Sequence, residues 1–367
     1  MNRKIISLAL ILTFIVFSGC SQNNRTLEQK LQSALLDNLE SNNVKGASLA
    51  IIFPNQKLIT VTAGFSHDTV KMKPDMFFAT GSITKNFVAT LTFKLAEQGL
   101  LSLNDPISKW LPKYPYVDST ITIKQLLHHE SGLYMFWENQ KLWDDLIKYR
   151  DSVFSPDVVL SYIKEPYFKP GKGFRYSNTN YLLLALIIKK ATGSNLSSEF
   201  RKLLWEPLNL KEVYLSQEEE LPTNLAHVWG DNFEKDGSFR DITFLPRVSH
   251  ESITYGSSGI FITAKDLAFW CYSLFNGKVL EKSSMKQMLD FNKDDYGLGV
   301  HLFNKSITDG EIVYGHGGAN IGTCAYMAYL PEYKVSIVLM INAFIGDCLD
   351  NMLEDIIEIV VENINTK

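Results

Sequence analysis

The chain has 367 residues, of which 46% are hydrophobic and 21% charged, with a formal net charge of -4 and a pI near 6.0. This is the balance of an ordinary globular protein, and no basic segment is concentrated enough to favour nucleic-acid binding. Because single cores stop growing near roughly 250–300 residues, we expect one large domain with a smaller attached lobe.

The first 19 residues are expected to be an export signal and not part of the fold. A basic start, Asn2-Arg3-Lys4, precedes the apolar run Ile5–Phe17, which is shorter than the about 20 residues that span a bilayer. The junction Ser18-Gly19-Cys20 resembles a bacterial lipoprotein signal. That resemblance implies cleavage before Cys20, lipidation of Cys20, a tether over residues 20–25, and a membrane-anchored domain in the periplasm or on the outer side of the cytoplasmic membrane. A plain secretory signal cut nearby is the alternative.

The first part of the mature chain reads as a helix, a hairpin and a second helix. Leucines at helical spacing predict an amphipathic helix over Thr26–Asn42. Gly46–Phe53 and Lys57–Gly64 are β-rich segments joined by a turn, which predicts a hairpin. A helix is expected from Ser82 to Gln98, where Gly99 is a C-terminal signal, and a short one over Ile123–His129.

The rest of the chain divides into a helix- and loop-rich lobe and a returning set of strands. Residues from about 134 to 250 contain six prolines and are assigned to the second lobe. Later elements are a helix over Ala264–Asn276, strands over Tyr296–Phe303, Glu311–Tyr314, Thr323–Leu330 and Lys334–Asn342, and a closing helix over Asp347–Asn363. Strands at both ends with helices between them predict the α+β class: a mainly antiparallel sheet built from both chain ends and covered by helices. This main domain should cover residues 26–363.

Three cysteines remain after Cys20, and they are Cys271, Cys324 and Cys348. An odd number without a C-x-x-C pair or a histidine cluster favours neither a disulfide framework nor a metal site. We expect them to be buried small apolar residues, and we expect no metal and no cofactor.

The segment Phe77–Lys94 contains Ser82 and Lys85, spaced as S-x-x-K. If Ser82 opens a helix, Lys85 lies one turn later on the same face. A serine hydroxyl needs a base to become a nucleophile, and lysine can serve only as a neutral amine with a lowered pKa. By itself the spacing equally fits an N-cap serine followed by a solvated lysine.

Two further segments could complete such a pair. In Pro170–Tyr181, Tyr176 offers a hydroxyl that can carry a proton, and Asn178 an amide that can hold the lysine or a substrate carbonyl; the plain alternative is a turn with Asn178 as a helix cap. In Tyr314–Gly322, His316 stands before two glycines whose backbone can approach a ligand closely, or is simply a turn histidine.

Taken together and in this order, the three segments resemble the serine β-lactamase and penicillin-binding protein family, with its S-x-x-K, middle and K-T-G motifs. The middle motif Tyr176-x-Asn178, and connecting text such as Leu126–Leu133 and Ser257–Leu267, resemble the class C and D-alanyl-D-alanine-carboxypeptidase branch over roughly residues 30 to 360. The resemblance implies the β-lactamase/transpeptidase-like α/β sandwich fold.

The same resemblance implies a role for each site residue. Ser82 would be acylated, and Lys85 and Tyr176 would share general-base and general-acid duty, with the leader left open. Asn178 would orient Lys85 and the substrate amide. The substrate-binding strand would consist of His316, Gly317, Gly318 and Ala319. The backbone N–H groups of Ser82 and Ala319 would form the oxyanion hole.

The third segment departs from the family where a substrate carboxylate is usually held. The positions that commonly carry hydroxyls are Gly317 and Ala319, and His316 stands where β-lactamases carry lysine. Losing a hydrogen bond to a charged group costs about 1.5–3 kcal/mol, so we expect weak β-lactam hydrolysis. An unperturbed imidazole would offer charge only below about pH 6.5.

The remaining candidates have simpler interpretations. His67, His227, His250 and His301 have no chemical partners in sequence and are expected to be structural or exposed. Tyr134, Phe136 and Trp137 could line the cleft mouth or pack between the lobes.

The sequence therefore predicts an exported, lipid-anchored serine hydrolase of the bacterial cell envelope. It would form an acyl-enzyme on a small ester, a D-amino-acid peptide or a related cell-wall compound. The alternatives are a true β-lactamase or D,D-carboxypeptidase and, from another class, an idle domain that binds peptidoglycan fragments or assembles with partners. The oligomeric state is not indicated.

Overall fold

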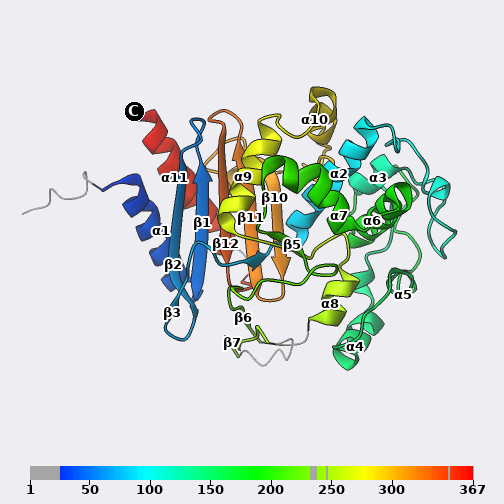
Figure 1. Ribbon diagram of the computed structural model, residues 1–367, viewed down its shortest axis with the longest axis horizontal. Coiled ribbons are helices and arrows are strands. Elements are labelled where there is room, and N and C mark those ends of the chain that lie inside the picture. Colours follow the sequence, from blue (N-terminus) through cyan, green and yellow to red (C-terminus); the bar gives the residue numbers. More distant parts are fainter. Residues whose placement is uncertain (1–24, 232–237, 245–246, 346–347, 367) are drawn as a thin grey trace, which may run out of the picture.

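The structure is a computed structural model that describes residues 25–231, 238–244, 247–345 and 348–366. A seven-stranded sheet forms its centre, with every neighbouring pair antiparallel, in the order β3-β2-β1-β12-β11-β10-β9 (Figure 1). The strands are β1 (Gly46–Ile52), β2 (Leu58–His67), β3 (Val70–Lys71), β9 (His301–Leu302), β10 (Tyr314–Asn320), β11 (Thr323–Leu330) and β12 (Val335–Ile341). Because β1 pairs with β12, both chain ends build one sheet, and the predicted α+β class is confirmed.

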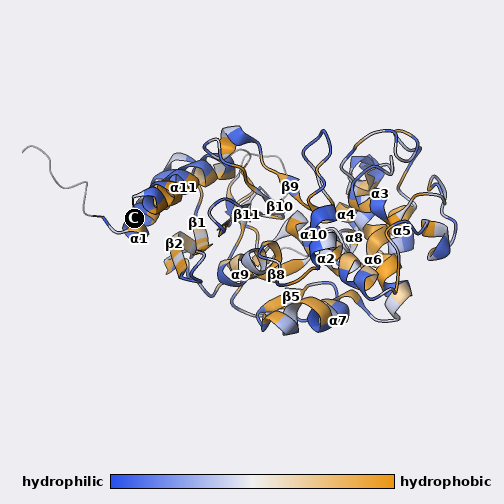
Figure 2. Cartoon of the chain, turned by 90° about the horizontal axis from the view of Figure 1, so that it is seen from above, coloured by the Kyte–Doolittle hydropathy of each residue, from blue (hydrophilic) through white to orange (hydrophobic). Residues whose placement is uncertain are grey.

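Helices cover both faces of this sheet (Figures 1 and 2). On one face lie α1 (Leu27–Ser41) and α11 (Cys348–Asn365), and on the other α9 (Ala264–Phe275). Alternate residues of strand β12 point to opposite faces of the sheet. Because helices cover both faces, the strand is buried along its whole length. Ile337 belongs to the core under α1 and α11, while Val338 belongs to the core shared with α9 and the helical lobe.

The second lobe is helical and packs against one edge of the sheet. Its principal helices are α2 (Thr84–Glu97), α3 (Ile123–Leu127), α4 (Gln140–Lys148), α5 (Pro156–Leu160), α6 (Asn178–Thr192), α7 (Leu196–Phe200) and α8 (Val248–Ile253). Helices α2 and α3 precede residue 134 but pack against α6, so the lobe also draws on the segment before the expected range. Within the described part, no helix has the length and apolarity to cross a bilayer.

Short strands and one further helix connect the two parts. A three-stranded sheet has the order β4-β8-β5, formed by β4 (Phe78–Ala79), β5 (Val213–Leu215) and β8 (Ile260–Ile262). The pair β6 (Trp229–Gly230) and β7 (Arg240–Asp241) lies at the lower edge in Figure 1, and α10 (Lys282–Met288) at the upper edge.

Two predicted strands differ from the observed ones. The strand expected over Tyr296–Phe303 is reduced to the two residues of β9. The backbone N–H of Gly297 donates to the carbonyl of Val300 in a local turn, and that of Leu298 donates to the carbonyl of Met288 at the end of α10. The strand expected to end at Tyr314 instead begins there and runs through the third motif. The chain before it is held in a turn.

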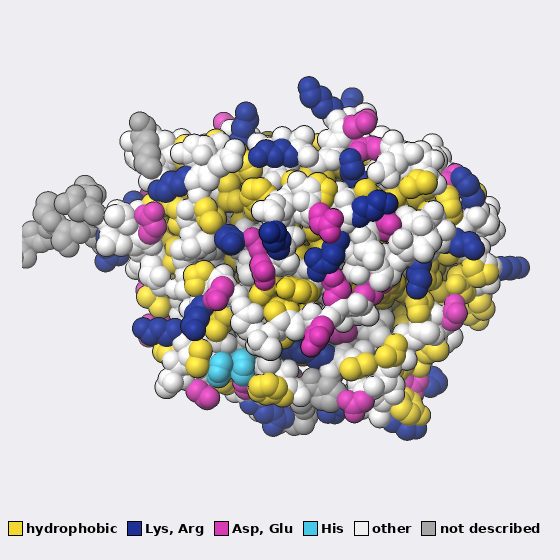
Figure 3. Space-filling model, in the orientation of Figure 1, with side chains coloured by type: hydrophobic (Ala, Val, Ile, Leu, Met, Phe, Trp, Pro, Cys, Tyr) yellow, Lys and Arg dark blue, Asp and Glu magenta, His cyan; other side chains and the backbone are white. Residues whose placement is uncertain are grey.

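One face of the surface and two of the three later cysteines can be described. On the face in Figure 3, basic and acidic side chains alternate without a large area of one sign. Cys271 and Cys324 are both buried, as expected. The predictions for the signal, for Cys20 and for the side chain of Cys348 lie outside the described residues.

Candidate active site

Ser82 lies in a tight 3-10 turn, Gly81–Ile83, that leads directly into α2. The turn is fixed at its start because both the backbone N–H and the hydroxyl of Thr80 donate to the carbonyl of Ile260, at 2.9 and 3.0 Å. Gly81 has a φ of +54°, and a Cβ there would lie 2.3 Å from the carbonyl oxygen of Ala319. Only glycine permits this approach, and it brings the nucleophile turn against β10.

Lys85 points back at Ser82 from the first turn of α2. A 2.7 Å hydrogen bond joins its Nζ to Ser82 Oγ, and Nζ also donates to the backbone carbonyl of Ser257 at 3.1 Å. The side chain is fully buried, and among the described residues no carboxylate pairs with it. Burial without a counter-charge lowers the pKa of Lys85 well below its ordinary value, which is the condition for a neutral amine.

Tyr176 approaches the same serine from the segment just before α6. Its hydroxyl hydrogen-bonds with Ser82, and its ring centroid lies 4.8 Å from Lys85 Nζ. Burial raises the pKa of Tyr176 well above its ordinary value, although the hydrogen bond to Ser82 acts in the opposite direction. At neutral pH Tyr176 is therefore a phenol, and it can donate a proton.

Asn178 is the first residue of α6 and not its cap, and its backbone N–H donates to Met135 Sδ at 3.1 Å. The Oδ1 atom is buried and has no hydrogen-bond partner among the described residues. No hydrogen bond joins Asn178 to Lys85 in the described part, where the carbonyl of Ser257 holds the amine instead. An unfilled buried acceptor in a site remains available to an N–H of a substrate.

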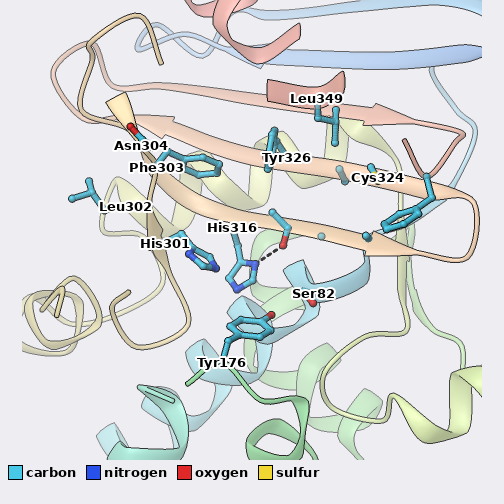
Figure 4. A pocket seen from close by; sticks show the side chains of 15 residues that line it. Ser82, Tyr176, His301, Leu302, Phe303, Asn304, His316, Cys324, Tyr326 and Leu349 are labelled. Atoms are coloured by element: carbon cyan, nitrogen blue, oxygen red, sulfur yellow. Dashed lines mark hydrogen bonds between the residues drawn. The ribbon is translucent and has the colours of Figure 1, made fainter. Parts of the chain in front are cut away.

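His316 is buried, and both of its ring nitrogens are used within the protein. Nδ1 lies 2.5 Å from the carbonyl of Gly317, which can only accept, so Nδ1 carries the proton (Figure 4). Nε2 therefore accepts a hydrogen bond from the hydroxyl of Tyr296 at 3.2 Å. Burial lowers the pKa of His316 well below its ordinary value, as do the nearby His301 and Lys85. An anion contact through a charged His316 near pH 6, as the sequence suggested, is not available in this arrangement.

Glycine at position 318 lets β10 press against the nucleophile turn. A Cβ there would lie 2.0 Å from the carbonyl oxygen of Thr80 and 2.9 Å from the backbone nitrogen of Ser82. Ala319, the next residue, packs its backbone against Gly81. The backbone N–H groups of Ser82 and Ala319 therefore lie on adjacent segments, at the start of a helix where N–H groups lack intrahelical partners. The oxyanion-hole assignment stays a prediction.

A cavity of about 560 Å³ opens over these groups (Figure 4). The site residues that line it are Ser82, Tyr176, His316, Gly317, Gly318 and Ala319, and its far wall is formed by Phe303, Cys324, Tyr326, Phe344 and Leu349. Sequence, spacing and fold thus bring the predicted residues of three distant segments to one site. Among the described residues, no group of three or more His, Cys, Asp or Glu side chains is arranged to bind a metal.

His301 is a site residue that the sequence-based interpretation missed. It lines the cavity, with its ring 4.7 Å from that of His316 and 6.1 Å from that of Tyr176. Burial, with a contribution from Lys85, lowers its pKa to about 4. It stands two residues past Gly299 in a segment without a motif, so only its pairing with β10 reveals its position.

The other singled-out aromatic and histidine residues lie outside this cavity. Phe136 is fully buried, and Trp137 packs on Trp143 and His250. Trp143 and His250 line a second cavity of about 740 Å³, which meets the first at Ala319 and Phe344. His67 and His227 stack on each other at 3.6 Å away from the site, and His227 contacts Asp241 at 2.5 Å.

Curated proteins similar to this chain include penicillin-binding proteins. Curated relatives include Penicillin-binding protein 4* of Bacillus subtilis (strain 168), 27% identical over 76% of this chain and 64% of that protein. Protein flp of Staphylococcus aureus (strain N315) is 25% identical over 93% of this chain and 66% of that protein. The chain thus spans just under two thirds of the length of these relatives.

Two solved structures share the fold along nearly their whole length. A D-stereospecific amidohydrolase from Streptomyces sp. superposes with a TM-score of 0.76 at 26% identity, covering 89% of this chain and 97% of that one. The D-amino acid amidase from Ochrobactrum anthropi SV3 complexed with D-phenylalanine gives a TM-score of 0.81, covering 92% and 99%, at 23% identity, which supports the fold alone.

The model of the family described as Beta-lactamase matches residues 24–358, and so nearly all of the chain. The three motifs that carry the resemblance in the sequence come together in space at Ser82. This chain therefore belongs to the Beta-lactamase family of serine hydrolases.

Proposed function

We propose that this chain is an exported serine hydrolase that forms an acyl-enzyme on Ser82 with a small ester or amide substrate. The observation that carries the proposal is the 2.7 Å contact between Ser82 Oγ and the Nζ of a fully buried Lys85 that has no described ion-pair partner. A domain that only binds ligands has no need for a desolvated amine beside a hydroxyl, because burying such an amine is costly.

Lys85 is assigned as the base and Tyr176 as the acid. The lowered pKa of Lys85 provides an amine lone pair for the hydroxyl proton of Ser82, while the raised pKa of Tyr176 keeps its proton available. When Oγ attacks the substrate carbonyl, Lys85 takes the serine proton and the carbonyl oxygen becomes an anion held by the two backbone N–H groups. Tyr176 then protonates the leaving oxygen or nitrogen, and the ammonium of Lys85 returns a proton to Tyr176.

Hydrolysis of the acyl-enzyme follows the same route with water as the nucleophile. Lys85 takes a proton from water, and Ser82 leaves as the hydroxyl. The buried Oδ1 of Asn178 has no partner among the described residues, and we assign it to accept an N–H from an amide substrate. This acceptor, and the likeness to a D-stereospecific amidohydrolase, support amide or D-amino-acid substrates beside simple esters.

Efficient β-lactam hydrolysis is not part of the proposal. Gly317 and Ala319 offer a substrate carboxylate no side-chain donor, and the ring nitrogens of His316 are already bonded. The cavity over these residues is lined by neutral side chains in the described part.

We place the enzyme outside the cytoplasm, with a lipid anchor at Cys20. The support is the basic start, the apolar run and the small residues before that cysteine. The membrane would be reached through the lipid.

The test is a substrate panel followed by mass spectrometry. Purified protein is incubated with chromogenic esters, D-amino-acid amides, D-alanyl-D-alanine peptides and a cephalosporin, and stopped samples are digested. We expect turnover of at least one ester or amide and a mass increase on the peptide that contains Ser82. Absence of any adduct, with no turnover across the panel, would contradict the proposal.

A further inference from the structure

Tyr326 lines the far wall of the active-site cavity and faces the third motif. Residue 326 lies directly opposite Gly317 in the β10–β11 pairing, so the two positions share one face of the sheet. A Cβ built on Gly317 would lie 2.6 Å from Cε1 of Tyr326. The tyrosine ring therefore occupies the space into which a side chain at position 317 would project.

The tyrosine is held in place from two sides. Its hydroxyl donates a hydrogen bond to Oδ1 of Asp350 in the first turn of α11, and its ring packs edge-on against Phe303 at 5.2 Å. Because the phenolic proton is directed at Asp350, the hydroxyl does not donate that proton to a substrate anion. Tyr326 thus lines the cavity, and the Asp350 carboxylate lies behind it as the partner of its hydroxyl.

The rest of that wall provides nothing to offset the negative charge. Its described residues are largely apolar, Phe303, Phe344 and Leu349 among them, and none of those described lining residues is Lys or Arg. Of the polar lining, Asn304 is an uncharged amide. His301 is neutral at physiological pH, because burial lowers its pKa to about 4. An anionic group placed here would lose water and lie near the Asp350 carboxylate behind Tyr326, with no basic side chain among the described lining residues.

We propose that Tyr326 and Asp350 form an anion-excluding wall that restricts this serine hydrolase to substrates with an uncharged group on the β11 side of the scissile bond. The inference rests on the proposed acyl-enzyme chemistry at Ser82 and names its substrate class: neutral esters and amides with an apolar leaving group. Tyr326 and Asp350 act on specificity, and neither takes part in bond making.

The test uses two esters of the same acyl group, one of phenol and one of 3-hydroxybenzoate, which differ by a single carboxylate. We expect wild-type enzyme to prefer the phenyl ester in kcat/KM. Asp350→Asn should raise the ratio of carboxylate to neutral ester by about tenfold, which corresponds to about 1.4 kcal/mol. The control Asp37→Asn makes the same charge change on the exposed face of α1 and should leave the ratio as it is.

A second pair of variants tests whether the Tyr326 ring occupies the space of a side chain at position 317. Gly317→Thr alone should lower kcat/KM for both esters, because the new side chain meets the Tyr326 ring. Gly317→Thr combined with Tyr326→Ala should recover activity and favour the carboxylate ester further. If Gly317→Thr alone raises the ratio of carboxylate to neutral ester as much as the double variant does, Tyr326 does not form the proposed wall.

Binding to Ser82→Ala protein, measured by calorimetry, separates this inference from the proposed function. The 3-hydroxybenzoate ester should bind more weakly than the phenyl ester, and Asp350→Asn should narrow the difference. Equal dissociation constants for the two esters would overturn the anion-excluding wall even if Ser82 is acylated. Absence of Ser82 acylation in the wild-type enzyme by either ester, with the binding difference intact, would instead speak against the chemistry.

Discussion

Gly318→Ala offers a direct test of how β10 and the nucleophile turn fit together. Gly318 has ordinary strand backbone and is not in the left-handed region, so an alanine there introduces only a steric change. Its Cβ would lie 2.0 Å from the carbonyl oxygen of Thr80, whereas real Cβ atoms essentially never approach within 3.0 Å. The strand or the turn must therefore retreat by about 1 Å.

That displacement separates the two backbone N–H groups assigned to the oxyanion hole. A misplacement of about 1 Å can cost roughly 10²-fold, and loss of one oxyanion donor roughly 10²–10³-fold. We expect kcat/KM for the best ester of the panel to fall by about 10²–10³-fold. Overpacking of this kind also costs about 1–3 kcal/mol of stability, so the thermal midpoint should fall by a few degrees while the protein stays folded.

The assay compares Gly318→Ala with a matched glycine variant. Gly173→Ala adds a Cβ 3.3 Å from the Phe168 ring, a contact that a small ring movement relieves, and should keep kcat/KM within about threefold of wild type. Circular dichroism and thermal unfolding of both variants verify folding. If Gly318→Ala keeps wild-type kcat/KM, the placement of β10 against Ser82 does not form the catalytic geometry.

Three further outcomes are expected. Ser82→Ala should abolish turnover and the acyl adduct while retaining the fold, as judged by mass spectrometry and thermal unfolding; near wild-type activity would refute the nucleophile assignment. Lys85→Met should inactivate the enzyme and change the pH dependence of stability. With a lowered folded pKa, wild-type protein binds a proton at Lys85 on unfolding, so its stability rises with pH by up to about 1.4 kcal/mol per unit until the unfolded pKa near 10.4. Denaturant titrations between pH 7 and 10 should show this slope in wild type and less of it in Lys85→Met; parallel curves would contradict a neutral Lys85. Cys20→Ser should release the protein from membranes on fractionation, and membrane association that persists in high salt would contradict the lipid anchor.

The features that sequence predicts well are those set by short-range spacing. Ser82 and Lys85 are three residues apart, so a single helical turn fixes their distance once the helix forms. The sheet was predictable from β-rich segments at both chain ends, and the capping box at Thr26 marks the start of α1 within one residue of the prediction. The helix starts and the individual strands are decided by interactions within a few residues, whereas the pairing of β1 with β12 joins opposite ends of the chain.

The features that sequence did not reveal depend on contacts between distant segments. The carbonyl that holds Lys85 belongs to Ser257, 172 residues away, and a backbone carbonyl leaves no mark in the sequence. The strand over Tyr296–Phe303 was overpredicted because its hydrogen bonds go to a local turn and to Met288. Gly317 was correctly identified as lacking a hydroxyl, but the ring of Tyr326 that fills its place could be found only from the β10–β11 register.

Charge in this site follows from burial more than from residue type. The rings of Tyr176 and Tyr181 lie 4.8 and 5.7 Å from the amine of Lys85, and that amine acts electrostatically on His301 and His316. Burial is the largest cause of the pKa shift in each of these four rings. Every shift favours the neutral form, because a charge removed from water without a partner is costly. The catalytic centre thus carries no compensating charge before reaction. The first charges to form are the oxyanion and the lysine ammonium, and they form together a few ångströms apart, where their attraction is strong because water is excluded. A carboxylate added to this centre, whether on a substrate or by His316→Asp, would stabilise the ammonium before the attack and so weaken Lys85 as a base.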